Sequence, residues 1–254
     1  MPHTLSVDAN LRRQHGGHGD PVLLLLHGLG GTGDVWSGCQ PLLTQRWPGR
    51  WVAPDLPGHG GSTPLPEYTF DGLAAAIAPL VVGADRVVVL GHSLGGVVGL
   101  SLAGAQRTVE RVIGLGIKVS WSEEDLARAG ALATRPPAWF DTRDEAAARY
   151  LRVSGLAGLV GPGDSIVDAG LREEDGRWRL ALDPRAFGVG APDMAGLLAG
   201  TEAAVVLTRG EHDPMNTDEQ LAALGAPTVT LAGLGHSAHV ENPEKTVLKR
   251  APSR

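Results

Sequence analysis

The segment Gly91-His92-Ser93-Leu94-Gly95 constrains the fold of this chain more than any other feature. It follows a run of mostly aliphatic residues, 86–90, and leads into a second apolar stretch, 97–103. A strand, a tight turn that carries serine and a helix together form a nucleophile elbow, in which glycines make room for backbones that pass close to each other. The pattern therefore predicts a serine hydroxyl that projects clear of a sheet.

The composition is that of one globular domain. The 254 residues can form a single large core, and 43% of them are hydrophobic while 20% are charged. A net charge of −6 gives no basic surface, so no nucleic-acid partner is expected. Cys39 is the only cysteine, which excludes an internal disulfide framework, and we expect it to be a small buried residue on a helix.

The sequence shows no segment that would direct the protein to a membrane. Residues 1–13 lack the apolar core of a signal peptide, and no stretch approaches about 18 uninterrupted apolar residues. These observations predict a cytoplasmic protein without a membrane partner.

Apolar runs of strand length alternate with helix-length segments along most of the chain. The strand candidates are 22–26, 51–53, 87–90, 112–116, 205–207 and 228–231. Helices are expected at 34–46, 70–82, 94–105 and 217–224. Continuous apolar runs indicate strands that are covered on both faces, so the sequence predicts an α/β fold with a doubly wound, mostly parallel sheet and helices on both faces.

This alternation breaks between residues 121 and 200, where no buried parallel strand is found. Helices are expected at 123–133 and 143–152. The alternating residues around Asp175-Gly176 predict a hairpin over 171–182.

We therefore expect a core of residues 1–120 and 201–254 with a cap insertion of residues 121–200. The cap is rich in aromatic side chains, which could line a substrate pocket or form the small core of the cap itself. The pocket candidates are Trp121, Trp139, Phe140 and Trp178.

A serine hydroxyl becomes a strong nucleophile only when a base removes its proton and a third group orients that base. Asp213 follows the predicted strand 205–207, and His236 follows the strand 228–231. Because the carboxyl ends of parallel strands meet at one edge of a sheet, these residues can converge there. Ser93, Asp213 and His236 are thus candidates for a catalytic triad.

Five sequence blocks occur in the order that one enzyme family uses. They are His27-Gly28-Leu29-Gly30-Gly31, the Asp-x-x-Gly-x-Gly-x-Ser loop at 55–62, the elbow at 91–95, Gly-Glu-His-Asp at 210–213 and the Gly-His block within 233–244. With these blocks the chain resembles the α/β-hydrolase family over nearly its whole length.

The resemblance implies a role for each residue. Ser93 would be the nucleophile, His236 the base and Asp213 the acid that orients the base. The backbone N–H groups of Leu29 and Leu94 would form the oxyanion hole, which stabilises charge that develops only in the tetrahedral intermediate. Such a site uses no cofactor, and none is expected.

The other histidines are not expected to bind a metal. The nine histidines are scattered, and none forms the i, i+4 helical pair typical of zinc hydrolases. His27 and His59 lie in glycine-rich loops, where we expect their rings to hold the backbone in place.

Alternatives exist for the acid and for the base. Glu211 competes with Asp213, and Asp125 is a weaker candidate that follows an earlier strand. His239 lies three residues after His236, but the segment 242–244 (Asn-Pro-Glu) has the N-cap, proline and acid of a helix start. The chain is therefore expected to descend toward that helix at His239, which favours His236 as the base.

The resemblance implies a carboxylesterase-like enzyme that hydrolyses a small-molecule ester or lactone. A serine at the elbow sets the chain apart from dehalogenases and epoxide hydrolases, which have aspartate there. Within 121–200, 13 acidic residues outnumber nine arginines, so a small, largely apolar ester is favoured over a phosphate-rich acyl carrier. The alternatives are a thioesterase, a C–C bond hydrolase, a cofactor-free lyase, a perhydrolase and a hydrolase-like ligand receptor.

Overall fold

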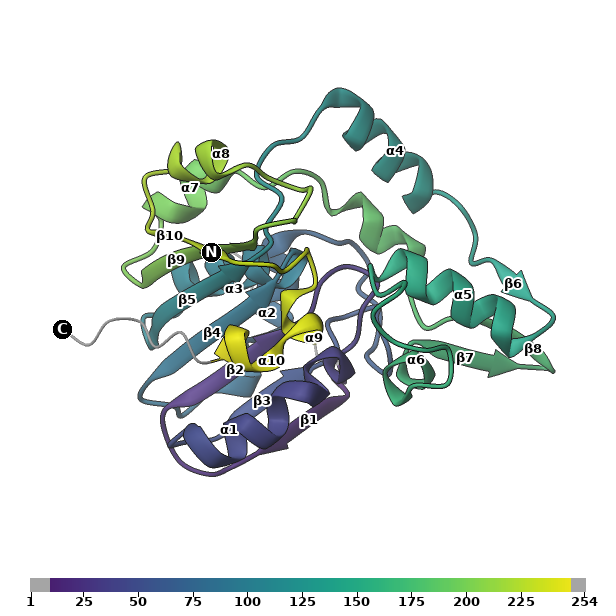
Figure 1. The fold of residues 1–254 in the computed structure, drawn as a ribbon, viewed down its shortest axis with the longest axis horizontal. Coiled ribbons are helices and arrows are strands. Elements are labelled where there is room, and N and C mark those ends of the chain that lie inside the picture. The colour runs from purple at the N-terminus through teal and green to yellow at the C-terminus, as the bar shows by residue number, and fades with distance from the viewer. Residues whose placement is uncertain (1–9, 248–254) are drawn as a thin grey trace, which may run out of the picture.

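The computed structural model describes residues 10–247. Its core is a seven-stranded sheet with the order β1-β3-β2-β4-β5-β9-β10 (Figure 1). The strands are β1 (Arg13–Gly16), β2 (Val22–Leu26), β3 (Trp51–Pro54), β4 (Val87–His92), β5 (Val109–Leu115), β9 (Ala204–Gly210) and β10 (Thr228–Leu231). Neighbouring strands are parallel except for β1 and β3. The predicted fold class is confirmed, and all six predicted strands are present.

The sequence does not predict the seventh strand, β1. Its residues are Arg-Gln-His-Gly, and they alternate between exposed and half-buried positions. An edge strand has one neighbour only and needs no continuous apolar run, so hydrophobicity alone does not reveal it.

Helices cover both faces of the sheet. One face carries α2 (Phe70–Ile77), η2 (Ala78–Val81), α3 (Leu94–Ala105) and α7 (Met194–Ala199), and the other carries η1 (Gly33–Cys39), α1 (Gln40–Arg46), α9 (Ala238–Glu241) and α10 (Pro243–Val247). The short helix α8 (Asp218–Ala222) contacts β10. Successive residues of β2 point to opposite faces, so Leu24 packs in the core with α3 while Leu25 packs in the core with η1. Cys39 is fully buried in this second core, as expected.

Two of the predicted helices are each divided into a 3-10 segment and an α-helix. Pro41 lies in the first turn of α1, and Pro79 lies in the first turn of η2. Proline has no N–H group to continue the i→i−4 hydrogen-bond ladder, so the ladder restarts at these positions. No helix within residues 10–247 combines the length and the apolar character that a bilayer crossing requires.

A second group of elements lies to one side of the core (Figure 1). It contains α4 (Glu123–Ala133), β6 (Trp139–Phe140), α5 (Arg143–Val153), α6 (Ser165–Ala169), β7 (Leu171–Glu174), β8 (Arg177–Leu180) and η3 (Pro184–Val189). The three strands form an antiparallel sheet with the order β6-β8-β7. Asp175 and Gly176 both have positive φ, 51° and 77°, which is the conformation that a two-residue hairpin turn needs.

We propose that this group, within residues 121–200, is a cap on the core formed by residues 1–120 and 201–254. The helix α7 falls inside that range but packs against α3 of the core, where Met194 is buried. The part that stands apart from the core therefore ends before α7.

Backbone hydrogen bonds attach the cap to the glycine-rich loop that follows β3. The N–H of Gly60 donates to Ala181 O at 2.7 Å, and the N–H of Asp183 donates to Gly58 O at 2.7 Å. The Tyr68 hydroxyl donates to the Asp183 carboxylate at 2.9 Å. These bonds fix the end of the cap hairpin against the core.

Close contact between backbones explains the glycines of the elbow. A Cβ added at Gly91 would lie 2.4 Å from Gly95 O, and one added at Gly95 would lie 2.4 Å from Leu26 O. Real Cβ atoms do not approach backbone oxygen so closely, and the backbone has little freedom to move away. The start of α3 can therefore pack on β2 and β4 only without these side chains.

We predict that Gly95→Ala destabilises the protein by about 3 kcal/mol or more, because the new methyl group overlaps the Leu26 carbonyl. The matched control is Gly104→Ala near the other end of α3, where a Cβ would be 3.4 Å from its nearest neighbour, Gly200 O. That variant should be neutral or gain up to about 1 kcal/mol from helix propensity. Urea unfolding measures both, and equal stabilities would contradict the packing argument.

Candidate functional site

Ser93 lies at the junction of β4 and α3 in a strained backbone conformation. Its φ is 48° and its ψ is −116°, which non-glycine residues rarely adopt. The Ser93 N–H donates to Leu115 O at 2.8 Å, and Ser93 O accepts from the N–H of Gly96 at 3.0 Å. The serine is half-buried and lies at the carboxyl end of the sheet.

His236 and Asp213 are brought together from two separate loops. His236 Nδ1 is 3.1 Å from both carboxylate oxygens of Asp213. The Asp213 side chain is fully buried, whereas that of His236 is 19% exposed. With Nδ1–H donating to the carboxylate, Nε2 of His236 is left as a proton acceptor, which is the tautomer that a general base requires.

Glycines place this pair and the serine around the same strand end. Gly116 follows β5 with a φ of 64°, and a Cβ added there would lie 3.1 Å from both Asp213 Oδ2 and His236 Nδ1. The preceding residue, Leu115, accepts the hydrogen bond from Ser93. The backbone of Ser93 and the pair of His236 and Asp213 thus both lie at the end of β5.

The loop 27–31 lies against the serine. A Cβ added at Gly28 would be 3.3 Å from Ser93 Cβ. The N–H groups of Leu29 and Leu94 make no hydrogen bond within residues 10–247. Both amides are therefore free to bind an oxygen atom at the elbow.

Two residues that sequence reasoning missed hold the loop of Asp213. The Arg209 guanidinium donates to Asp213 O at 3.2 Å and to Glu211 O at 2.9 Å. The buried Asn216 side chain donates to Ile117 O and accepts from the N–H of Val119. The sequence did contain a signal for Arg209, because it is a charged residue at the end of the otherwise mostly apolar strand β9. A buried charged residue normally has a polar partner, so its position indicated a structural role.

The alternative acids have other partners. Glu211 accepts a hydrogen bond from the Gly233 N–H at 2.8 Å. Asp125 caps the start of α4 and pairs with Lys118 at 2.7 Å. The structure brings neither of them to His236.

The alternative base, His239, lies in α9 and is buried. Its ring packs between Trp36 at 4.4 Å and His92 at 4.5 Å, measured between ring centroids. Neither of its nitrogens makes a hydrogen bond within the described part of the chain. Its surroundings are apolar and aromatic, and no carboxylate orients it.

His27 and His59 bond to backbone, as expected of residues that hold loops in place. His27 Nε2 accepts from the Leu56 N–H at 2.8 Å, and its Nδ1 donates to Gly28 O at 2.8 Å. His59 Nδ1 donates to Pro57 O at 3.1 Å. Burial lowers the pKa of His27 to about 4 and that of His59 to about 3, so both rings are neutral at pH 7.

A cavity of about 150 Å³ lies among the elements of the proposed cap. It is lined by Leu132, Arg135, Pro136, Pro137, Ala138, Arg149, Val153, Leu180, Leu182, Pro184 and Phe187. A Cβ added at Gly30 would lie 2.7 Å from Val153 Cγ1, so the end of α5 packs directly on the loop 27–31. Val153 therefore joins the cavity to the elbow region.

None of the four predicted pocket aromatics lines this cavity. Trp121 bonds Lys118 O, and Trp139 is 37% exposed with Arg177 and Arg179 against its ring. Phe140 and Trp178 pack against the apolar cluster that joins Ala147 and Tyr150 of the cap to Leu25 and Cys39 of the core. Neither side chain is among the residues that line the cavity.

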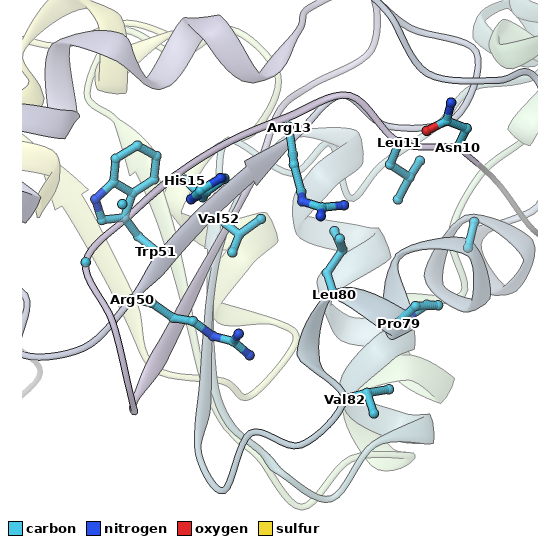
Figure 2. A pocket seen from close by; sticks show the side chains of 13 residues that line it. Asn10, Leu11, Arg13, His15, Arg50, Trp51, Val52, Pro79, Leu80 and Val82 are labelled. Atoms are coloured by element: carbon cyan, nitrogen blue, oxygen red, sulfur yellow. The ribbon is translucent and has the colours of Figure 1, made fainter.

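A larger cavity of about 510 Å³ lies on another part of the molecule (Figure 2). It is formed between β1, β3 and η2, with Arg13, Arg50 and Val82 at its wall. Ser93, Asp213 and His236 are not among its lining residues, so cavity size alone does not locate the candidate site.

Residues 10–247 contain no cluster of three or more histidine, cysteine or acidic side chains with the geometry to hold a metal ion. The groups near this end of the sheet are the Ser93 hydroxyl, the pair of His236 and Asp213, and the amides of Leu29 and Leu94. This set can activate a hydroxyl and stabilise an oxyanion.

Comparison with known proteins identifies the family. Residues 23–249 match the model of the Alpha/beta hydrolase family, which covers most of the chain. The chain therefore belongs to the alpha/beta hydrolase family.

Several curated proteins are similar in sequence. Lipase LipV of Mycobacterium tuberculosis is 31% identical over 185 residues, which cover 69% of this chain and 68% of the lipase. The pimeloyl-[acyl-carrier protein] methyl ester esterase of Methylococcus capsulatus is 40% identical over 83 residues, 33% of this chain and 31% of that protein. An uncharacterized protein of Mycobacterium tuberculosis is 40% identical over 86 residues, so the chain spans only 25% of its length.

Solved structures share the fold at lower identity. E-2-(acetamidomethylene)succinate hydrolase superposes with a TM-score of 0.78 and 23% identity, covering 93% of this chain and 91% of that one. The thioesterase domain from the curacin biosynthetic pathway superposes with a TM-score of 0.72 and 22% identity, covering 91% of this chain and 92% of that one. These likenesses establish the same architecture.

We predict that the protein loses stability as the pH falls below about 6.5. Burial lowers the pKa of His239 to about 3, and burial also holds the pKa of His92 well below its ordinary value. Together with His27 and His59, these rings bind protons in the unfolded state at a pH where the folded state does not. Each ring should lower the free energy of unfolding by about 1.4 kcal/mol per pH unit below 6.5, until the pH reaches the pKa of that ring in the folded state.

Urea unfolding between pH 7.5 and pH 5 measures this dependence. In the variant His239→Leu, the slope of the free energy of unfolding against pH should decrease by the equivalent of one proton. The free energy of unfolding of this variant at pH 7.5 should not fall, because the His239 ring makes no hydrogen bond that could be lost. A pH-independent free energy of unfolding over this range would contradict the prediction.

Proposed function

We propose that this protein is a serine hydrolase that cleaves a small, largely apolar carboxylic ester or lactone. The observation that carries the proposal is the 3.1 Å pair of His236 and Asp213 at the strand end that also binds the Ser93 backbone. We infer a small-molecule substrate, because Val153, which packs on the loop 27–31, lines a cavity of only about 150 Å³.

In the first half of the reaction, Ser93 Oγ attacks the substrate carbonyl carbon while His236 Nε2 takes the hydroxyl proton. The carbonyl oxygen becomes an oxyanion and accepts hydrogen bonds from the N–H groups of Leu29 and Leu94. Asp213 stabilises the imidazolium that forms. Collapse of the intermediate breaks the ester bond, and the leaving alcohol receives the proton from His236.

In the second half, water attacks the acyl group on Ser93. His236 accepts a proton from this water and then returns it to Ser93 Oγ when the acid departs. The same two amides stabilise the second oxyanion. The free enzyme is regenerated, and the products are an acid and an alcohol.

The names of the relatives support hydrolysis of an acyl group. They include a lipase, a methyl ester esterase, a thioesterase domain and an N-acyl homoserine lactonase. All four names denote transfer of an acyl group to water, which is the chemistry that a hydroxyl nucleophile with an oxyanion hole performs.

We predict that Ser93→Ala lowers kcat for p-nitrophenyl acetate by about a thousandfold or more while the fold is retained. The substitution removes only the attacking oxygen and leaves the backbone of the elbow unchanged. Steady-state kinetics and circular dichroism measure the two effects. Activity above a few per cent of the wild-type value would show that Ser93 is not the nucleophile.

We predict that His236→Ala lowers kcat by roughly a thousandfold, the scale expected when the base of a triad is removed. The matched control is His239→Ala, which should lose less than about tenfold, since that ring contacts Trp36 and His92 and no carboxylate. The same kinetic assay compares them. If the two phenotypes are exchanged, the base assignment is wrong.

A further inference from the structure

The cavity among the elements of the proposed cap combines apolar walls with two arginine side chains. Arg135 lies at its exposed end, and Arg149 on α5 is half-buried. Neither guanidinium makes an ion pair or a side-chain hydrogen bond within residues 10–247. A half-buried, unpaired cation beside an apolar cavity is costly, and an anion that enters the cavity offsets this cost.

Most other arginines of the cap have acidic partners. The pairs are Arg128 with Glu124, Arg143 with Asp168, Arg177 with Asp141, Arg179 with Glu174 and Arg185 with Asp183. The acid one helical turn before Arg149 is Glu145, but its carboxylate accepts the Thr142 N–H in the capping box of α5. Of the cap arginines without an acidic partner within residues 10–247, Arg135 and Arg149 line the cavity, whereas Arg152 is exposed and Arg172 bonds carbonyl oxygens.

Arg149 and Val153 are four residues apart on α5, so they lie on the same face of that helix. Val153 contacts the loop 27–31 beside Ser93, while Arg149 is about 6 Å further along the helix axis. An acyl chain that extends from the serine past Val153 would thus reach the guanidinium within a short distance.

We propose that the substrate is a half-ester of a short dicarboxylic acid, whose free carboxylate binds to Arg149 and Arg135. The inference rests on the proposed function and adds the charge of the acyl group. The methylenes of the chain occupy the apolar walls, and the planar guanidinium of Arg149 binds the carboxylate through two parallel hydrogen bonds.

The size of the cavity favours a carboxylate over a phosphate-bearing carrier. A volume of about 150 Å³ is similar to that of cavities that hold benzene, which corresponds to about six heavy atoms. The part of a glutaryl group beyond its ester carbonyl, three methylenes and a carboxylate, has about six heavy atoms and fits this volume. The cap as a whole carries more acidic residues than arginines, which opposes a carrier with several negative charges.

A matched pair of methyl esters tests the inference. Monomethyl glutarate and methyl pentanoate have the same acyl length and differ only in the terminal carboxylate. We expect kcat/KM, measured by pH-stat titration, to be about tenfold or more higher for monomethyl glutarate. Equal values, or a preference for methyl pentanoate, would overturn the inference.

Arginine variants locate the charge effect. Arg149→Gln should raise KM for monomethyl glutarate by about tenfold or more, with a much smaller change in kcat, and should abolish the preference for monomethyl glutarate over methyl pentanoate. Arg152→Gln on the same helix is the control, because Arg152 is exposed and does not line the cavity. An unchanged KM in Arg149→Gln, with a retained fold, would overturn the assignment.

Two further measurements separate the inference from the proposed function. Ser93-dependent turnover of p-nitrophenyl acetate tests the hydrolase alone. Calorimetric titration of monomethyl glutarate into Ser93→Ala tests the carboxylate site without any turnover, and binding should weaken about tenfold in Ser93→Ala/Arg149→Gln. The inference is overturned if Ser93→Ala does not bind monomethyl glutarate at millimolar concentration. It is also overturned if an acyl-pantetheine phosphate binds more tightly than monomethyl glutarate and this binding depends on Arg149.

Discussion

The close approach of α3 to β2 and β4 is the constraint on which the candidate site depends. A strand that turns directly into a helix at Ser93 forces a φ of 48° on a residue with a side chain. This strain persists because the backbones on either side are packed too tightly to relax, with Gly91 and Gly95 at the contact points. The hydroxyl is thus fixed on rigid elements, and the loops that carry the base and the acid need only reach the same sheet edge.

The two loops are held by different means. The acid loop is fastened by polar side chains that are mostly buried, since Arg209 bonds its carbonyl groups and Asn216 joins it to the segment after β5. The histidine loop rests on packed rings, because His92 lies 4.6 Å from the His236 ring and its Nε2 donates to His236 O at 3.1 Å. Burial lowers the pKa of His92 well below its ordinary value, so the neutral ring adds no competing positive charge beside the base.

The proposed cap is attached to the core at two places. Hydrogen bonds from Gly60 and Asp183 fasten its hairpin to the core, and Val153 presses the end of α5 onto the loop 27–31. On the function that we propose, the small cavity of the cap selects substrates by length and charge. Of the cap aromatics, Phe187 lines the small cavity together with Arg149 and aliphatic residues, while Phe140 and Trp178 pack against the apolar cluster.

The sequence by itself determined the sheet, the helices on its faces and the turn at Ser93, because apolar periodicity and glycine spacing are local signals. It also named the pair of His236 and Asp213, since both follow strands whose carboxyl ends must meet. Only the tertiary structure decided that Glu211 bonds to Gly233, that the four cap aromatics lie away from the cavity and that Arg149 lacks a counter-ion. These outcomes depend on contacts between segments far apart in the chain, and neither composition nor periodicity encodes which face of the cap meets the core.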